Sequence, residues 1–279
     1  MCELLGMVAN QPADLTFSFT GLALRGGQTG PHADGWGLSL YDGKFARTFR
    51  EKDPAHSSRL ALFLRENPIH TRLAIAHVRK MTRGVASLVN THPFVRVLNK
   101  RHMVFAHNGT LPKIKERRLR VESTLGDTDS EHAFCVILET LREAYGSRHP
   151  DDLRELGKTL WELGSELGSD GVFNFLFADG ENLFAHCGDN LAFIEWRAPF
   201  DRTTLVDAEI QVRLEDMMGP SRDASMAVVA TSPLTRDSTW IKAAPGTLWA
   251  FSRGRLEHTF DPPANYEPAP SGAPAWEPA

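Results

Sequence analysis

The order of hydrophobic patterns along the chain constrains its fold most strongly. Strand-like segments come first, two helical segments follow in the middle, and strand-like segments return up to about residue 251. The first helical segment repeats apolar residues at helical spacing from Phe134 to Tyr145, behind a capping box of Thr128 and Glu131. The second starts near Pro150 and aligns leucines from Leu153 to Leu167. This order predicts an α+β fold with sheets sandwiched between helical layers.

Local patterns predict the remaining elements. In the first half we expect helices over about 15–22 and 57–66, and strands over 2–9, 38–41, 44–49, 73–78 and 103–106. After Gly171 we expect strands over 172–178, 183–187, 191–196, 226–231 and 247–251. The strand that carries Cys2 should lie centrally in a sheet. Residues 2–260 are predicted to form one domain and residues 261–279, rich in Pro and Ala, a disordered tail.

Composition excludes several classes of protein. A net charge of −4 argues against nucleic-acid binding by phosphate neutralisation, and no apolar run is long enough to span a membrane. The first residues lack the pattern of a signal peptide, so we predict a cytoplasmic protein. Cys2, Cys135 and Cys187 are scattered without metal-ligand spacing, so we expect neither a disulfide framework nor structural zinc. We also expect no metal, flavin or nucleotide cofactor.

Cys2 follows Met1 directly, and removal of Met1 would place a thiol and a free α-amine on one residue. The α-amine titrates near ~7.7–8.0 and the thiol near ~8.5, so the amine can take the thiol proton around neutral pH. An N-terminal nucleophile paired with its own amine is a known route of activation. Taken alone, the same residue would equally suit the start of a buried strand.

Four polar clusters lie further along the chain. They are His77-Val78-Arg79 with Thr82, Asn90-Thr91-His92-Pro93, His107-Asn108-Gly109, and Thr128-Asp129-Ser130-Glu131. Three of them have an alternative explanation: Arg79 could form a surface ion pair, Asp129 could stabilise a helix N-terminus, and Asn108-Gly109 is a common turn dipeptide.

Together with Cys2, these clusters resemble the motifs of the class II, or N-terminal-nucleophile, glutamine amidotransferase domain. The resemblance covers about residues 2–250 and is greatest to stand-alone bacterial members, which begin M-C-E-L-L-G-M and carry D-G-W-G near residue 35. It implies the four-layer α-β-β-α sandwich of the N-terminal nucleophile hydrolases, with two packed antiparallel sheets. Lys80 departs from the pattern, because several branches of the family carry an aromatic residue after the arginine.

The resemblance also implies roles for individual residues. Cys2 would attack the γ-amide of glutamine, and Asn108 and Gly109 would donate hydrogen bonds to the oxyanion. Arg79 would bind the α-carboxylate and Asp129 the α-ammonium of the substrate. Thr82 and His92 would shape the pocket, whereas His77 and His107 are expected to be structural.

Three functions follow from this interpretation. The first is hydrolysis of the γ-amide of L-glutamine through a Cys2 thioester, giving glutamate and ammonia, with a separate ammonia-accepting synthase as an open question. The second is an amidohydrolase for a larger γ-glutamyl peptide or metabolite. The third is a catalytically silent glutamine-binding module.

Overall fold

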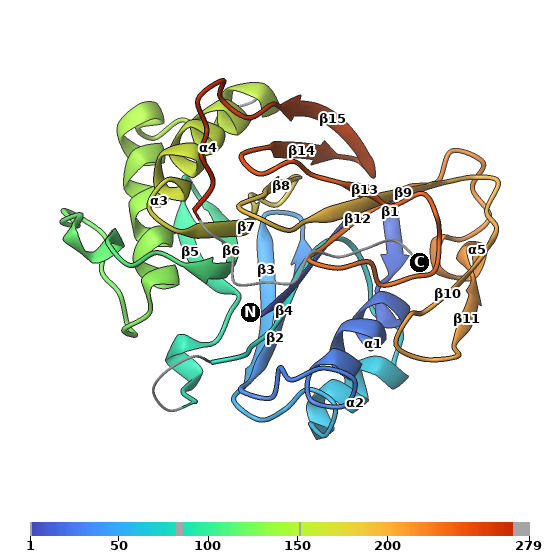
Figure 1. The fold of residues 1–279 in the computed structure, drawn as a ribbon. Helices are drawn as coiled ribbons and strands as arrows, with labels where there is room; N and C mark the ends of the chain where they lie inside the picture. Colours follow the sequence, from blue (N-terminus) through green and yellow to red (C-terminus); the bar gives the residue numbers. More distant parts are fainter. Residues whose placement is uncertain (1, 82–85, 151, 270–279) are drawn as a thin grey trace.

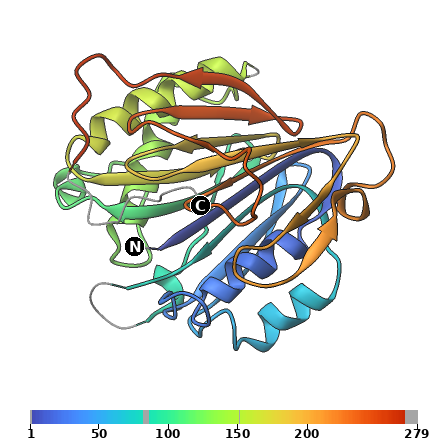
Figure 2. The same ribbon diagram turned by 45° about the vertical axis from the view of Figure 1, so that its right-hand side comes forward.

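Two antiparallel β-sheets packed face to face form the centre of the molecule (Figures 1 and 2). The computed structural model describes residues 2–81, 86–150 and 152–269. The larger sheet has seven strands in the order β13 (Ile241–Lys242), β9 (Ala192–Arg197), β12 (Ser225–Ala230), β1 (Glu3–Asp14), β4 (His70–Val78), β2 (Trp36–Asp42) and β3 (Phe45–Glu51). β1, which begins directly after Cys2, therefore lies in the middle of this sheet, as predicted.

The smaller sheet has six strands in the order β15 (Arg255–Phe260), β14 (Leu248–Ser252), β8 (Asn182–His186), β7 (Val172–Ala178), β6 (Arg101–Thr110) and β5 (Phe94–Leu98). β10 (Arg202–Thr204) and β11 (Gln211–Arg213) pair separately as a two-stranded sheet. All strand pairs in these sheets are antiparallel.

Three clusters of buried apolar side chains separate four layers. One joins the seven-stranded sheet to α1 (Thr16–Arg25), α2 (Arg59–Glu66) and the short helix α5 (Leu214–Met218). Another joins the six-stranded sheet to α3 (Asp129–Tyr145) and α4 (Leu153–Gly168). The third lies between the two sheets. The predicted α-β-β-α sandwich is therefore confirmed.

Alternation along β1 explains why this strand is buried on both faces. Leu4 and Val8 point into the cluster between the sheets, whereas Leu5, Met7 and Ala9 point into the cluster below α1. Successive side chains of a strand face opposite sides, so a central strand with helices below it and a second sheet above it must be apolar throughout.

The start of α3 agrees in part with the capping box that the sequence predicted. Thr128 is the N-cap, and its Oγ1 accepts a hydrogen bond from the Glu131 N–H at 3.1 Å. The carboxylate of Glu131 accepts from the N–H groups of Leu125 at 3.0 Å and Gly126 at 2.7 Å, so it stabilises the preceding loop. The second bond of a capping box, from the Thr128 N–H to the Glu131 carboxylate, is absent from the described residues.

Some elements differ from the prediction. α4 begins at Leu153, three residues beyond Pro150, with Asp152 as its N-cap. The strands β5, β10, β11, β13 and β15, the helix α5, and two 3-10 turns over Leu88–Asn90 and Ile114–Glu116 were not expected from the sequence.

Residues 261–269 contain no helix or strand. The ring of Tyr266 nevertheless packs against Gly168 at the end of α4 and against Gly246. The rest of the predicted tail, residues 270–279, lies outside the described residues.

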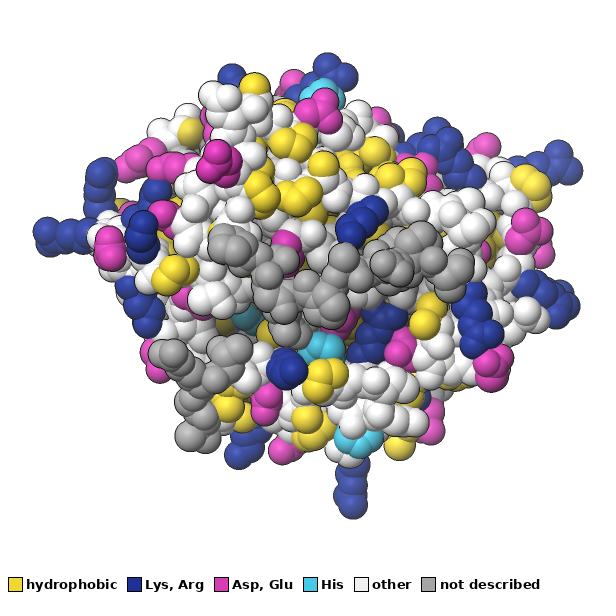
Figure 3. All heavy atoms as spheres, viewed as in Figure 1, with side chains coloured by type: hydrophobic (Ala, Val, Ile, Leu, Met, Phe, Trp, Pro, Cys, Tyr) yellow, Lys and Arg dark blue, Asp and Glu magenta, His cyan; other side chains and the backbone are white. Residues whose placement is uncertain are grey.

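On the face shown in Figure 3, basic and acidic side chains are interspersed over the surface, and they do not form one large basic patch. In the described part of the chain, no helix has both the length and the apolarity needed to cross a membrane.

Candidate active site

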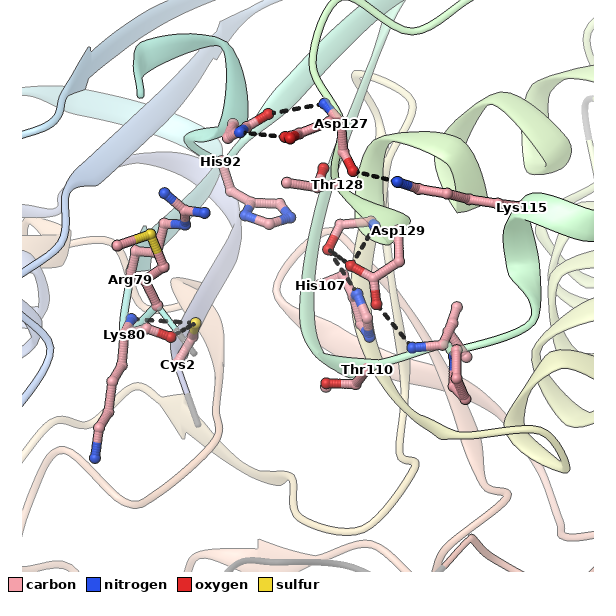
Figure 4. A pocket seen from close by; sticks show the side chains of 16 residues that line it. Cys2, Arg79, Lys80, His92, His107, Thr110, Lys115, Asp127, Thr128 and Asp129 are labelled. Atoms are coloured by element: carbon pink, nitrogen blue, oxygen red, sulfur yellow. Dashed lines mark hydrogen bonds between the residues drawn. The ribbon is translucent and has the colours of Figure 1, made fainter. Parts of the chain in front are cut away.

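A cavity of about 490 Å³ opens where β1 begins and where β4 and β6 end. Five of the residues expected at the site line it, namely Cys2, Arg79, His92, Gly109 and Asp129. Figure 4 shows Cys2, Arg79 and Lys80 on one side of the cavity and His107, Thr110 and Asp129 on the other. Asn108 joins them through its hydrogen bonds to Cys2. Thr82 lies outside the described residues.

The Cys2 sulfur lies against the backbone of Lys80. The Lys80 N–H points at Sγ with an N to Sγ distance of 3.3 Å, and Sγ lies 3.5 Å from the Lys80 carbonyl oxygen. Loss of solvent around the sulfur raises the pKa of the Cys2 thiol, and the Lys80 N–H acts in the opposite direction because it stabilises the thiolate. The thiol is therefore protonated near neutral pH and needs a base before it can act as a nucleophile.

The side chain of Asn108 forms hydrogen bonds with both the N–H and the carbonyl group of Cys2. Its Oδ1 accepts from the Cys2 N–H at 2.9 Å, and its Nδ2 donates to the Cys2 carbonyl at 2.6 Å. An amide nitrogen carries two hydrogens, so one N–H of Asn108 is left for a further acceptor next to the nucleophile.

Gly109 stands where β6 runs unusually close to β7. Its φ is +153°, and a Cβ at this position would come within 1.8 Å of the Val172 carbonyl oxygen. No other residue can therefore occupy the position without moving β7. The close approach that requires glycine is to the protein's own backbone, in addition to any approach of a substrate.

Arg79 directly follows β4 and is only 9% exposed. Among the described residues, its Nη1 atom has no hydrogen-bond partner although it is buried. A buried guanidinium nitrogen without a partner loses free energy, and an anionic group in the cavity would restore the missing hydrogen bond. Arg79 therefore has the position and the unused donor expected of a carboxylate-binding residue.

Asp129 is the first residue of α3 and faces Arg79 across the cavity. Its Oδ2 accepts from the Leu111 N–H at 2.7 Å and its Oδ1 from the Ser130 N–H at 2.9 Å. These bonds orient the carboxylate, and each oxygen keeps a lone pair for a further donor. Asp129 thus stabilises the helix start and also presents negative charge to the cavity.

His107 is fixed in one tautomer by its neighbours. Burial lowers its pKa, so the ring is neutral. The Val172 carbonyl, 3.1 Å from Nε2, can only accept, so Nε2 donates to it. Nδ1 then accepts from the Ser130 hydroxyl at 2.9 Å. His107 thereby connects β6 to the start of α3.

His92 lies between two other rings on the cavity wall. Its ring centroid is 4.4 Å from that of His77 and 4.5 Å from that of Phe94. Burial lowers the pKa of His92 well below its usual value, so the side chain is uncharged. Neither ring nitrogen has a hydrogen-bond partner within the described ranges.

Asn90, Asp127 and Lys115 were not assigned to the cavity from the sequence. Asn90 Nδ2 donates to Asp127 Oδ1 at 2.6 Å, and the Asp127 N–H donates to Asn90 Oδ1 at 3.1 Å. Lys115 Nζ donates to the Asp127 carbonyl at 2.6 Å. Asn90 belongs to a motif segment that the sequence marked and Asp127 directly precedes another, whereas Lys115 carried no signal.

The described residues contain no group of three or more His, Cys, Asp or Glu side chains arranged to hold a metal ion. The Cys2 thiol, the Arg79 guanidinium and the Asp129 carboxylate line a single cavity.

A model of the family described as glutamine amidotransferases class-II matches residues 1–274. The chain belongs to this family. The Escherichia coli K12 protein named "Putative glutamine amidotransferase YafJ" is 43% identical to this amidotransferase over 254 residues, which cover 91% of this chain and 98% of that protein.

Solved structures agree with this assignment. The crystal structure of a protein described as "predicted glutamine amidotransferase from Pseudomonas aeruginosa PA01" has 35% identity and a TM-score of 0.72, over 92% of this amidotransferase and 100% of that chain. Glutamine phosphoribosylpyrophosphate amidotransferase from Bacillus subtilis has 17% identity and a TM-score of 0.62, over 95% of this chain and 50% of that one. The second likeness concerns the fold alone.

Proposed function

We propose that this amidotransferase hydrolyses the γ-amide of L-glutamine through a thioester on Cys2. One observation carries the proposal: a thiol, a buried guanidinium with an unused donor and an oriented carboxylate line one cavity. Free glutamine offers the matching groups, an electrophilic carboxamide, an α-carboxylate and an α-ammonium. Pairing of the two charged groups with Arg79 and Asp129 would hold the carboxamide beside Cys2.

The reaction requires that Met1 is removed. The Cys2 nitrogen then becomes an α-amine, held 2.9 Å from Asn108 Oδ1 if the present position is kept. That amine takes the thiol proton, and Sγ attacks the carbonyl carbon of the substrate's carboxamide. The negative charge that develops on the amide oxygen is stabilised by the free N–H of Asn108 and the N–H of Gly109.

Collapse of this intermediate breaks the C–N bond. The protonated amine returns its proton to the leaving nitrogen, so ammonia departs and a γ-glutamyl thioester remains on Cys2. Water then attacks the thioester with the amine as base, which releases glutamate and restores the thiol. Transfer of the ammonia to a separate synthase, and a cytoplasmic location in which Cys135 and Cys187 stay reduced, belong to the same proposal.

A second candidate is a larger γ-glutamyl amide. The cavity of about 490 Å³ has more room than free glutamine needs, and the Lys80 side chain extends away from Asp129 beside the reacting sulfur (Figure 4). A leaving amine that continues beyond the scissile bond would lie on this side. Comparison of kcat/KM for L-glutamine with that for γ-glutamyl amino acids separates the two candidates.

A glutamine analogue that carries a chloroketone in place of the carboxamide tests the proposal directly. We expect one covalent label on Cys2, protection by L-glutamine, and no label on Cys135 or Cys187, which are buried. Cys135→Ala is the matched control and should label like the wild type. Protein without Met1 that takes up no label would overturn the proposal, and label without turnover of any γ-glutamyl amide would favour a silent binding module.

A further inference from the structure

We propose that Asp34 is a positioning residue for the nucleophile, because it holds the segment Arg79–Met81 so that the Lys80 N–H points at the Cys2 sulfur. The inference rests on the proposed function for its kinetic part, whereas the reactivity of the thiol tests it separately. Asp34 does not line the cavity, so it acts through the backbone of its neighbours.

The segment Arg79–Met81 follows the end of β4 and is held by Asp34 and Gly35. The Asp34 N–H donates to the Arg79 carbonyl at 3.0 Å, and the Arg79 N–H donates to the Gly35 carbonyl at 2.8 Å. The Met81 N–H donates to Asp34 Oδ2 at 2.8 Å. Lys80 therefore lies between two residues whose backbones are both bonded to Asp34.

Gly35 explains why the chain can make this arrangement. Its φ is +117°, and a Cβ there would come within 2.8 Å of the Glu51 carbonyl oxygen. Glycine alone adopts this conformation without strain and fits beside β3. The Asp34-Gly35 pair thus turns the chain so that one carboxylate oxygen faces the Met81 N–H.

The position of the Lys80 N–H matters for the chemistry of Cys2. This group lies 3.3 Å from Cys2 Sγ, and a hydrogen bond to sulfur favours the thiolate over the thiol. Without the Asp34 carboxylate, the Met81 N–H loses its acceptor and Lys80 is held from one side only. The N–H would then spend less time aligned with the sulfur, and the pKa of the thiol would rise further.

Other charges that act on the thiol stay constant when Asp34 is changed. They are Arg79 directly after β4 and Glu3 at the start of β1, joined after processing by the α-amine that Cys2 gains when Met1 is removed. His77, His92 and His107 from β4, the 91–93 segment and β6 are neutral because burial lowers the pKa of each.

The test compares Asp34→Ala with Asp34→Asn in protein without Met1. Asparagine keeps an oxygen that can accept from the Met81 N–H, whereas alanine does not. We expect alkylation of Cys2 by iodoacetamide near pH 7 to slow by about three- to tenfold in Asp34→Ala, the effect of losing one hydrogen bond, with the pH profile moved upward. Asp34→Asn should restore the rate to within about twofold, and kcat on L-glutamine should follow the same order.

Asp152→Ala is the matched control, since it removes a carboxylate that accepts one backbone N–H, that of Arg154 at 2.8 Å, at the start of α4. It should leave the alkylation profile unchanged. The proposal is overturned if Asp34→Ala lowers Tm but keeps the wild-type profile, or if Asp34→Asn is as slow as Asp34→Ala. Loss of turnover in every variant would count against the proposed function, while the alkylation rates would still report on Asp34.

Discussion

Asn108 and Cys2 are joined by two hydrogen bonds that run in opposite directions, from the Cys2 N–H to Oδ1 at 2.9 Å and from Nδ2 to the Cys2 carbonyl at 2.6 Å. The pair fixes the residue directly before β1 against β6, which belongs to the other sheet. One side chain thus aligns the nucleophile and keeps an N–H beside it for the reaction.

Substitution Asn108→Ala removes both bonds and the remaining N–H. We expect kcat on the γ-glutamyl substrate to fall by about 10²–10³-fold, the usual effect of losing one oxyanion donor. The measurement is steady-state glutamate release with Tm recorded in parallel. A variant that keeps most of its kcat would contradict the assigned role.

Substitution Arg79→Lys keeps the charge but loses the planar fork that can hold a carboxylate by two bonds. We expect KM to rise by about 10- to 100-fold, since a hydrogen bond to a charged group is worth about 1.5–3 kcal/mol. Because the α-carboxylate does not react, kcat should change much less. A fall in kcat at unchanged KM would show that Arg79 does not bind this group.

Gly109→Ala tests the close approach of β6 and β7. The new Cβ would come within 1.8 Å of the Val172 carbonyl oxygen, so we expect a loss of more than about 3 kcal/mol in the free energy of unfolding, above the usual range for a single substitution.

Gly43→Ala provides the control for Gly109→Ala. Gly43 also has a positive φ, +58°, but a Cβ there has no heavy atom within 4 Å. Gly43→Ala should therefore lower the free energy of unfolding by only about 1 kcal/mol, measured by urea denaturation. Equal losses in the two variants would show that backbone conformation alone, and not contact with Val172, explains Gly109.

His77 should make the fold sensitive to acid. Burial lowers its pKa to about 3, so His77 stays neutral in the folded protein. The unfolded chain takes up a proton below its ordinary pKa of about 6.5, so stability is full above that pH and falls as the pH drops from about 6.5 towards 3. The slope from this residue is at most about 1.4 kcal/mol per pH unit.

His77→Leu should reduce this slope by up to about 1.4 kcal/mol per pH unit between about pH 6 and pH 5, which corresponds to one proton. The slope is measured by urea denaturation at several pH values. His70→Leu, at the exposed start of the same strand, is the matched control. An unchanged slope in His77→Leu would contradict the buried neutral histidine.

The sequence predicted the central elements of the fold because those elements are buried. β1, α3 and α4 carry apolar residues at the spacing of a strand or a helix, and burial requires that spacing. β5 and β15 were missed. They are the two edges of the six-stranded sheet. β15 is half-exposed and carries charged and polar side chains at most positions, whereas β5 carries an apolar pattern but spans only five residues.

The candidate site could be predicted only at the level of motifs. Cys2, Arg79, Asn108 and Asp129 stood in recognisable segments, and the structure brings those segments together. The contact between Cys2 and Lys80 joins residues 78 positions apart through a backbone N–H, and any residue type except proline can supply such a group. The reciprocal bonds of Asn90 and Asp127 likewise depend on how two loops meet, which local patterns do not encode.

The most direct measurement is release of glutamate and ammonia from L-glutamine by protein whose intact mass shows that Met1 is absent, alongside Cys2→Ala. We predict turnover by the wild type, with the two products in equal amounts, and none by Cys2→Ala. Retained turnover in Cys2→Ala, or none in the processed wild type, would contradict glutamine hydrolysis by Cys2.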